Sequence, residues 1–225
     1  MLYDFVQGPL VWVASVAFVV GVLFQVNQFF TLTKRKEPVI LSVGTAPQAT
    51  GKELKYWWEA VAEWLHSLKK TVWRTHTSVM AMTSVFHFFL IVTPFFVLGH
   101  NILLDQSLGF GFLSLPEFTT DVFTMVVSIC AAFFLYRRVF VARVRAITTG
   151  YDYLILMITA APFLTGYFAY HQWFDYNTVI FLHILSGEVM LITIPFTKLG
   201  HMIFFFLYRF LIGSEYSFSQ GTRTW

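Results

Sequence analysis

Charged residues are scarce in this sequence. Only 12% of its 225 residues are charged, whereas a soluble globular domain usually has about 25%. Apolar residues make up 57% of the chain and form several runs of about 20 residues with almost no charge, the length that crosses a bilayer. The composition therefore excludes a soluble globular domain and predicts a polytopic membrane protein. The net charge of +3 follows the membrane topology described below and does not indicate a nucleic-acid partner.

Cysteine is also nearly absent. The single thiol, Cys130, excludes an intrachain disulfide and an iron–sulfur cluster ligated by this chain alone. The sequence has no C-x-x-C-H motif, so any haem would be bound by coordination and packing. The first basic residue is Lys34 and no small-x-small cleavage site follows the first apolar run. We therefore expect the first helix to stay in the mature protein.

The apolar runs predict an all-α integral membrane fold, a bundle of five transmembrane helices in one domain, 1–225. The predicted spans are about 8–32, 72–99, 118–136, 149–170 and 178–211. Before the second span, residues 51–70 place apolar side chains on one helical face and charged side chains on the other. This pattern predicts an amphipathic helix in the membrane interface, in contact with lipid or a partner subunit. The tail, 213–225, is short and polar.

The distribution of basic residues predicts the orientation of the spans. Fourteen of the 15 Lys and Arg residues lie on one side of the predicted membrane: eight in 33–74, four in 137–148 and two at the carboxyl end. The remaining one, Lys198, lies within the fifth span, and the opposite side has none. We therefore expect the amino terminus outside and the carboxyl terminus in the cytoplasm, in a multi-pass protein of the bacterial inner membrane.

Histidines mark two of the spans. His183 and His201 are eighteen residues apart in the fifth span, which is five full helical turns and a rise of roughly 27 Å. His76 and His87 are eleven residues apart in the second span, about 20° off register with a rise of roughly 16 Å. The two side chains of each pair therefore project from the same side of their helix, at two different depths.

The two spans run in opposite directions, so depth predicts which histidines meet. We expect His87 to pair with His183 near the outer face and His76 to pair with His201 near the inner face. The unequal rises leave each pair offset by about 5 Å. Two neutral imidazoles fill both axial positions of a haem iron. The pattern therefore predicts two haem b groups, one above the other, with these four residues as the metal-binding and cofactor-binding ligands.

Other polar residues are candidate neighbours of the haems. His100 lies thirteen residues after His87, about 220° around a continuous helix, so we expect it on the wrong face for ligation. It is instead an outer-side candidate for propionate, quinone or proton contacts, with Asn101, His171, Asp105 and Asp121. The inner-side propionate candidates are Lys198, Arg74, Arg137, Arg138 and Arg209. Glu188 is an acid inside the fifth span, which is either functional or a neutral, hydrogen-bonded group between helices. His66 lies on the polar face of the amphipathic helix and is expected to be solvated.

These residues resemble a known family. Five spans with an external amino terminus and two histidine pairs are similar to the gamma subunit of respiratory nitrate reductase, a dihaem cytochrome b. The most specific part is the run His183-x-x-x-Gly187 followed by Ile194-Pro195-Phe196-x-Lys198-Leu199-x-His201. The length and short tail look closer to dihaem subunits of sulfate-reducer complexes, such as the smaller cytochrome b of the transmembrane high-molecular-weight cytochrome c complex.

The resemblance implies an electron-transfer role. Members of such families exchange electrons with menaquinone near the outer haem and pass them to a cytoplasmic iron–sulfur subunit, and a periplasmic multihaem cytochrome c can dock outside. We therefore expect a subunit of a respiratory oxidoreductase, assembled with other membrane subunits and not catalytic alone. The alternative is a haem-free membrane anchor, or a transporter whose histidines bind a metal ion.

Overall fold

The computed structural model describes residues 2–32 and 77–211. Within these residues all regular structure is helical, and no strand occurs. The predicted amphipathic helix 51–70 with His66, the polar tail 213–225 and two predicted site residues, Arg74 and His76, lie outside the described part of the chain.

Five helical segments are long and apolar enough to cross a membrane, which confirms the predicted number of candidate spans among the described residues. They are Tyr3–Leu32, Thr77–Phe96, Glu117–Phe140, Gly150–Tyr170 and Tyr176–Phe196. The first comprises α1 (Leu2–Phe5), the π-helix η1 (Val6–Leu10) and α2 (Val11–Leu32), and the others are α5, α7, α9 and α10 in that order. Shorter helices complete the described chain: α6 (Leu98–Leu108), α8 (Ala142–Arg145), the 3-10 turn η2 (Lys198–Gly200) and α11 (His201–Leu211).

The chain forms two compact units. The first comprises Met1–Val22 and Ala81–His201, and the second comprises Leu23–Met80 and Met202–Trp225. Within the second unit, the ring of Phe29 lies 6.2 Å from that of Phe204. All histidines discussed below belong to the first unit, so the site can be described within it alone.

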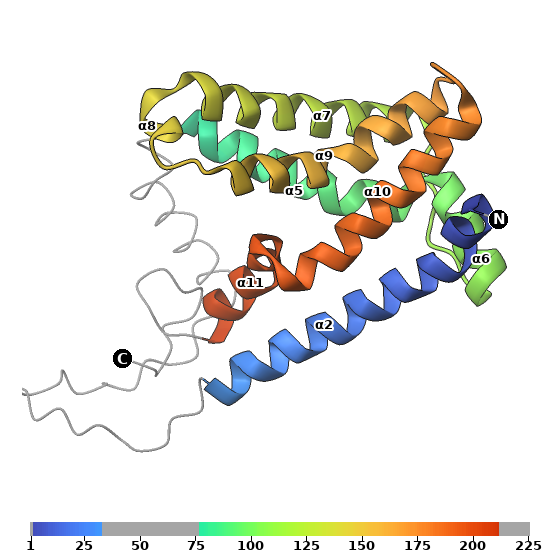
Figure 1. Ribbon diagram of the computed structural model, residues 1–225, viewed down its shortest axis with the longest axis horizontal. Helices are drawn as coiled ribbons and strands as arrows, with labels where there is room; N and C mark the ends of the chain where they lie inside the picture. The colour runs from blue at the N-terminus through green and yellow to red at the C-terminus, as the bar shows by residue number, and fades with distance from the viewer. Residues whose placement is uncertain (1, 33–76, 212–225) are drawn as a thin grey trace, which may run out of the picture. The chain divides into compact units, whose positions relative to one another are not determined.

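The first unit has its core where α5, α7 and α9 meet. Six buried residues form this cluster: Phe86 of α5, Val127, Cys130 and Ala131 of α7, and Ala160 and Phe163 of α9. The helix α9 packs against both α7 and α10 (Figure 1). Alanine at two of these positions allows the helix backbones to approach closely, as is common where membrane helices pack. Cys130 is fully enclosed at 2% exposure, which makes it a packing residue.

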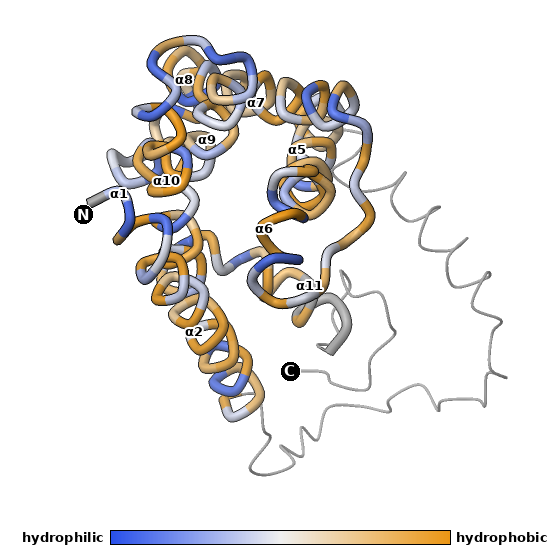
Figure 2. The backbone as a smooth tube through the Cα atoms, turned by 90° about the vertical axis from the view of Figure 1, so that its right-hand side faces the viewer, coloured by the Kyte–Doolittle hydropathy of each residue, from blue (hydrophilic) through white to orange (hydrophobic). Residues whose placement is uncertain are grey.

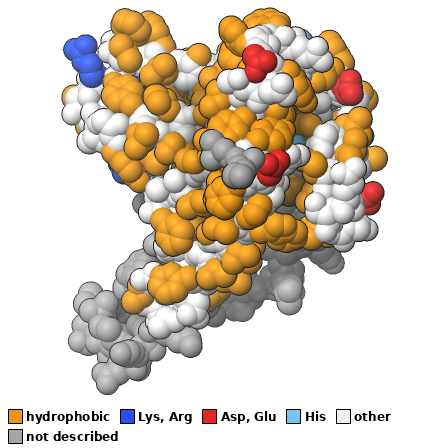
Figure 3. Space-filling model, turned by 45° about the vertical axis from the view of Figure 1, so that its right-hand side comes forward, with side chains coloured by type: hydrophobic (Ala, Val, Ile, Leu, Met, Phe, Trp, Pro, Cys, Tyr) orange, Lys and Arg blue, Asp and Glu red, His pale blue; other side chains and the backbone are white. Residues whose placement is uncertain are grey.

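Large apolar side chains also cover the outside of the helices. Val13, Phe118 and Met157 are 58%, 78% and 67% exposed. Figure 2 shows apolar residues along the length of the long helices and hydrophilic residues near α8. On the face drawn in Figure 3, hydrophobic side chains cover most of the described surface and charged groups stand at isolated points. An apolar exterior of this kind is expected for helices surrounded by lipid.

Two of the predicted spans are divided by breaks in the backbone. The predicted second span, 72–99, bends at Val97, whose ψ of 128° is extended, and a separate helix, α6, follows. The predicted fifth span, 178–211, bends at Thr197, with φ −128° and ψ −175°, and continues as η2 and α11. A proline lies two or three residues before each break, Pro94 in α5 and Pro195 in α10. Proline has no N–H to donate to the carbonyl four residues earlier, so each proline weakens its helix in the turn that precedes the break.

Polar side chains fix the starts of α9 and α10. The Thr149 backbone N–H and hydroxyl both donate to Asp152 at 2.8 Å, which forms a capping box at the start of α9. Asp175 accepts from the backbone N–H and hydroxyl of Thr178 at 2.9 and 2.7 Å at the start of α10. These hydrogen bonds from Thr178 hold the pKa of Asp175 below its ordinary value.

Candidate functional site: two histidine pairs

The first histidine pair joins α5 to α11. The Nε2 atoms of His87 and His201 lie 3.4 Å apart, although the residues are 114 positions apart in the sequence. The ring centroids are 5.7 Å apart and the rings are nearly perpendicular, at 86°. We call this arrangement the His87–His201 pair.

The second histidine pair joins α6 to α10. The rings of His100 and His183 lie nearly parallel, at 15°, with their centroids 5.8 Å apart. Gly166 of α9 makes room for the His183 ring, because a Cβ at this position would lie 2.9 Å from Cε1 and 3.1 Å from Nδ1 of the imidazole. We call this arrangement the His100–His183 pair.

All four rings present their Nδ1 atom to a backbone carbonyl oxygen. The partners are Thr83 for His87 at 2.8 Å, Pro94 for His100 at 2.9 Å, Pro162 for His183 at 2.9 Å and Lys198 for His201 at 2.7 Å. A carbonyl can only accept a hydrogen bond, so Nδ1 carries the proton in each ring and Nε2 carries the lone pair in the neutral form. This is the tautomer of a histidine that coordinates a metal through Nε2, with its other nitrogen held by a backbone carbonyl.

With this tautomer, the His87–His201 contact brings together two nitrogen atoms that can only accept a hydrogen bond. Both Nε2 atoms carry a lone pair in the neutral rings, so at 3.4 Å two acceptors face each other. This arrangement is unfavourable unless a positive charge, a proton or a metal ion lies between them. The pair therefore has the chemistry of a cation-binding site.

A carbonyl group at the end of α5 holds the His100 ring in place. A helix leaves its last carbonyls without helical partners, and at the end of α5 three of them accept from other groups. The carbonyl of Pro94 accepts from His100 Nδ1, Phe95 from Asn101 Nδ2 and Phe96 from Leu115 N–H, while Thr93 keeps a helical bond from Val97 N–H. The break at Val97 and the His100 ring therefore stabilise each other.

Asn101 ties this corner to the loop that follows α6. Its side-chain amide also donates to the carbonyl of Val97 at 3.3 Å and to the Ser114 hydroxyl at 3.2 Å, and its Oδ1 accepts from Phe112 N–H at 2.9 Å. The residue is only 5% exposed. These contacts give Asn101 a structural role at the corner, and its predicted propionate contact stays a prediction.

The structure pairs the predicted ligands differently from the expectation. His87 lies against His201 and not against His183, and the residue against His183 is His100, which the sequence analysis had placed on the wrong face. The reason is the break at Val97, since an angle of about 220° holds only along one continuous helix. The predicted partner of His201, His76, lies outside the described residues.

The bends also affect the rises expected from the sequence. The expected rise of roughly 27 Å between His183 and His201 assumed one continuous helix, whereas the chain bends between them at Thr197. The expected rise of roughly 16 Å belonged to His76 and His87, and His76 lies outside the described residues. Figure 1 shows α5 and α10 running in opposite directions.

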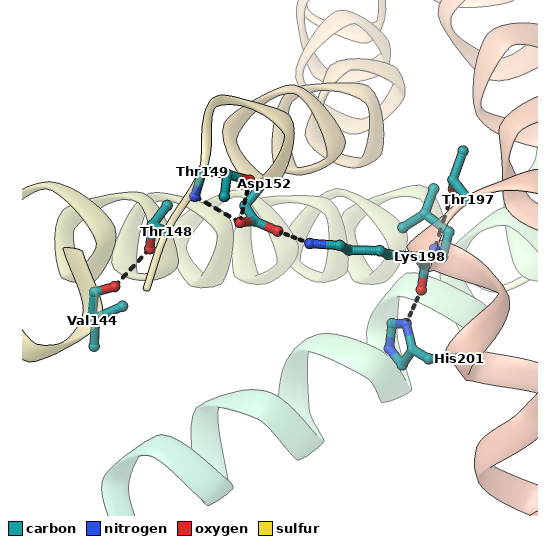
Figure 4. Close-up of polar contacts among 8 residues, drawn as sticks. Val144, Thr148, Thr149, Asp152, Thr197, Lys198 and His201 are labelled. Carbon is teal, nitrogen blue, oxygen red and sulfur yellow. Dashed lines mark hydrogen bonds and ion pairs between the residues drawn. The ribbon is translucent and has the colours of Figure 1, made fainter. Parts of the chain in front are cut away.

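Several predicted neighbours have partners of their own. Lys198 donates from Nζ to Asp152 at 2.7 Å (Figure 4), and its Nζ lies 5.3 Å from the ring centroid of Tyr151. The guanidinium carbon of Arg137 lies 5.8 Å from the ring centroid of Phe133, and Arg138 donates from Nη1 to the carbonyl of Phe134 at 3.4 Å. Their predicted propionate contacts stay predictions.

The predicted outer residues His171 and Glu188 stand apart from the pairs. The Nε2 of His171 lies 3.0 Å from Oδ1 of Asp121, so this nitrogen is engaged by a carboxylate. Glu188 is 4% exposed, and neither of its side-chain oxygens has a hydrogen-bond partner among the described residues. It lies seven residues before Pro195, which is two turns along α10, and both therefore share the face that meets Gly21 of α2.

The number of donors tests which cation the His87–His201 pair could hold. Two nitrogens on opposite sides of one metal ion lie about 4 Å apart, whereas at a tetrahedral ion they lie about 3.3 Å apart. The observed 3.4 Å is closer to the tetrahedral value. A tetrahedral site needs further ligands, however, and the described residues contain no group of three or more His, Cys, Asp or Glu that could hold a metal ion. A haem supplies four nitrogens itself, so two histidines from this chain would suffice to hold one.

Gly187 lies one turn after His183, and a Cβ at this glycine would meet no atom within 4 Å. Gly99 directly precedes His100 and lies on the exposed surface of its helix.

Sequence reasoning missed His100 as a partner of His183 and missed all four Nδ1 contacts. Pro94, three residues before the break and six before His100, was the available signal, because a proline often marks the end of a helix. The carbonyl partners are set by the backbone bends and have no signature in side-chain spacing.

The fold and the site define an all-helical protein with five candidate membrane spans and two cross-helix histidine pairs. The chain is 33% identical to a protein of the sulfate reducer Nitratidesulfovibrio vulgaris, strain Hildenborough, over 224 residues. The match covers 99% of this chain and 97% of the relative. The chain therefore belongs to the same family as this relative. No family model matches the sequence, and no solved structure matches it.

Proposed function

We propose that this protein is a membrane dihaem cytochrome b, in which the His87–His201 and His100–His183 pairs each hold one haem. The observation that carries the proposal is the set of four imidazoles that meet across helices with Nδ1 bound to a carbonyl. This proposal keeps three of the ligands expected from the sequence and replaces His76 by His100.

The protein supplies the ligands and their surroundings. The carbonyl contacts fix each ring's tautomer and orientation, so that Nε2 is available for coordination. A haem held by two of these histidines would exchange one electron and would bind no substrate at its iron. The apolar side chains of the surrounding helices would add a medium of low dielectric constant around it.

The positive-inside rule gives the proposed orientation of the two sites in the membrane. With the amino terminus outside, the His100–His183 pair lies toward the outer face and the His87–His201 pair toward the cytoplasm. The proposed partners are a quinone, such as menaquinone, or a periplasmic cytochrome c outside, and an iron–sulfur subunit inside. The resemblance to dihaem subunits of nitrate reductase and of sulfate-reducer complexes supports this assignment, and a relative from a sulfate reducer is compatible with it.

A haem assay on the purified full-length protein tests the proposal. Pyridine haemochrome measured against protein concentration, with a reduced-minus-oxidised spectrum, is expected to show two low-spin b haems per chain. A folded preparation without haem, from cells that supply haem to other cytochromes, would contradict the proposal.

The alternative is a transporter or site for a tetrahedral metal ion, and one observation favours it. The 3.4 Å between the two Nε2 atoms is close to the spacing of about 3.3 Å at such an ion. Elemental analysis of the same preparation separates the two candidates, because the transporter predicts bound zinc or a similar ion and no haem absorption.

A further inference from the structure

The turn that carries His201 is fastened to α9 by an ion pair. Lys198 begins η2, and its Nζ lies 2.7 Å from Oδ1 of Asp152 near the start of α9 (Figure 4). The Asp152 side chain is 19% exposed and that of Lys198 is 60% exposed. The contact thus joins two segments of the first unit that are 46 residues apart in the sequence.

The carboxylate of Asp152 is itself held in place. Its Oδ2 accepts from both the backbone N–H and the hydroxyl of Thr149 at 2.8 Å. Both carboxylate oxygens are therefore used, one for the cap of α9 and the other for Lys198. A carboxylate fixed in this way provides a defined anchor for the ammonium group.

Lys198 connects this anchor to the imidazole of His201. Its side chain binds Asp152, and its carbonyl oxygen accepts from Nδ1 of His201 at 2.7 Å. The preceding Thr197 hydroxyl donates to the carbonyl of Thr193 and accepts from Leu199 N–H, at 2.7 and 3.2 Å. Asp152, Lys198 and His201 therefore form one continuous chain of contacts.

The other member of the pair is supported differently. His87 binds the carbonyl of Thr83, one turn earlier in the same helix, so α5 alone fixes its ring. The carbonyl that holds His201 belongs to a three-residue turn between two helices. A contact outside the turn is therefore more important for His201 than for His87.

We propose that Asp152 is a positioning residue for His201, acting through Lys198 and the η2 turn. This inference rests on the proposed haem ligation and names a residue outside the histidine pairs. The ion pair holds the Lys198 carbonyl where it accepts from Nδ1, and this hydrogen bond sets the orientation and basicity of the ligand. Lys198 is then an internal partner of Asp152, and its predicted propionate contact stays a prediction.

The test replaces Asp152 by Asn in the full-length protein and measures the midpoint potential of each haem by a spectroscopic redox titration, with low-temperature EPR. Asp152→Asn removes the charge but keeps an oxygen for the Thr149 cap. We expect two haems per chain, with one potential raised because His201 becomes a weaker donor, and the other unchanged. Haem affinity at this site should fall by less than the roughly 10–100-fold seen when a direct partner of a ligand is removed.

Lys198→Met separates positioning from a simple charge effect. Positioning predicts that both variants raise the same potential, and that Asp152→Asn with Lys198→Met gives no larger shift than either alone. A purely electrostatic effect predicts opposite shifts, because one variant removes a negative charge and the other a positive charge. Opposite or additive shifts would overturn the inference, and Lys198→Arg should restore the potential toward that of the unmodified protein.

Asp175→Asn is the matched control, because Asp175 also caps a helix, and its carboxylate accepts from Thr178 at the start of α10. It should leave both potentials unchanged. If the unmodified protein binds no haem, the proposed function fails. If it binds two haems and neither Asp152→Asn nor Lys198→Met alters a potential or an EPR signal, only the positioning inference fails.

Discussion

The histidines of the described residues differ in which ring nitrogen is held by the protein and by which group. His87, His100, His183 and His201 each present Nδ1 to a carbonyl oxygen, whereas Nε2 of His171 lies against the carboxylate of Asp121. The first arrangement leaves a lone pair for a metal, and the second engages the nitrogen that would coordinate it. Hydrogen bonding, more than position within an apolar run, therefore distinguishes the candidate ligands from the other histidine of the described chain.

Gly166 provides a test at the scale of one residue. In Gly166→Ala the new Cβ would lie 2.9 Å from the His183 ring, so the ring has to move away from the Pro162 carbonyl. We expect loss of one of two haems per chain, or an altered EPR signal from one of them, with the other unaffected. The measurement is haem per chain by pyridine haemochrome, with EPR of the oxidised protein.

Gly150→Ala is the control for this change, because it lies on the same helix and its Cβ would meet nothing within 4 Å. It should keep both haems and both signals. If Gly166→Ala also left haem content and EPR unchanged, His183 would not be a ligand that depends on this close approach.

Among the helices, the two breaks bring the histidines together. Hydropathy predicted the lengths of the straight helices closely: the expected spans 118–136 and 149–170 correspond to Glu117–Phe140 and Gly150–Tyr170. It could not locate the bends at Val97 and Thr197, because an apolar run has the same composition on both sides of a bend. The same bends changed which histidines meet, because His100 and His201 each follow a bend and His87 and His183 each precede one.

Asn101 tests the α5–α6 break. Asn101→Leu keeps the approximate volume but removes hydrogen bonds to the carbonyls of Phe95 and Val97, and each buried group left unpaired costs about 1–3 kcal/mol. We expect a lower thermal unfolding temperature and earlier haem loss from the His100–His183 pair than from the His87–His201 pair. Thermal unfolding followed by absorbance of the two haems measures both effects.

Gln106→Leu, an exposed change on the same helix, is the control and should leave the order of haem loss unchanged. Simultaneous loss of both haems in Asn101→Leu, at an unchanged temperature, would mean that the corner does not support His100.

At the scale of the whole molecule, the protein combines an apolar exterior with two cross-helix histidine pairs in one compact unit. Large apolar residues are exposed on every long helix, and lipid would cover them in a membrane. The relative matches nearly the full chain, so the similarity includes all five candidate spans. Two haem sites on antiparallel helices would form the electron path that we propose.

Double variants test the pairing on which this reading depends. We would replace His87 with His201 by Leu in one protein, and His87 with His183 by Leu in another, and measure haem per chain by pyridine haemochrome in folded preparations. The structure predicts that His87→Leu with His201→Leu retains one haem, because both changes remove the same site, whereas His87→Leu with His183→Leu retains none. The reverse result, one haem with His183→Leu and none with His201→Leu, would contradict the pairing described here.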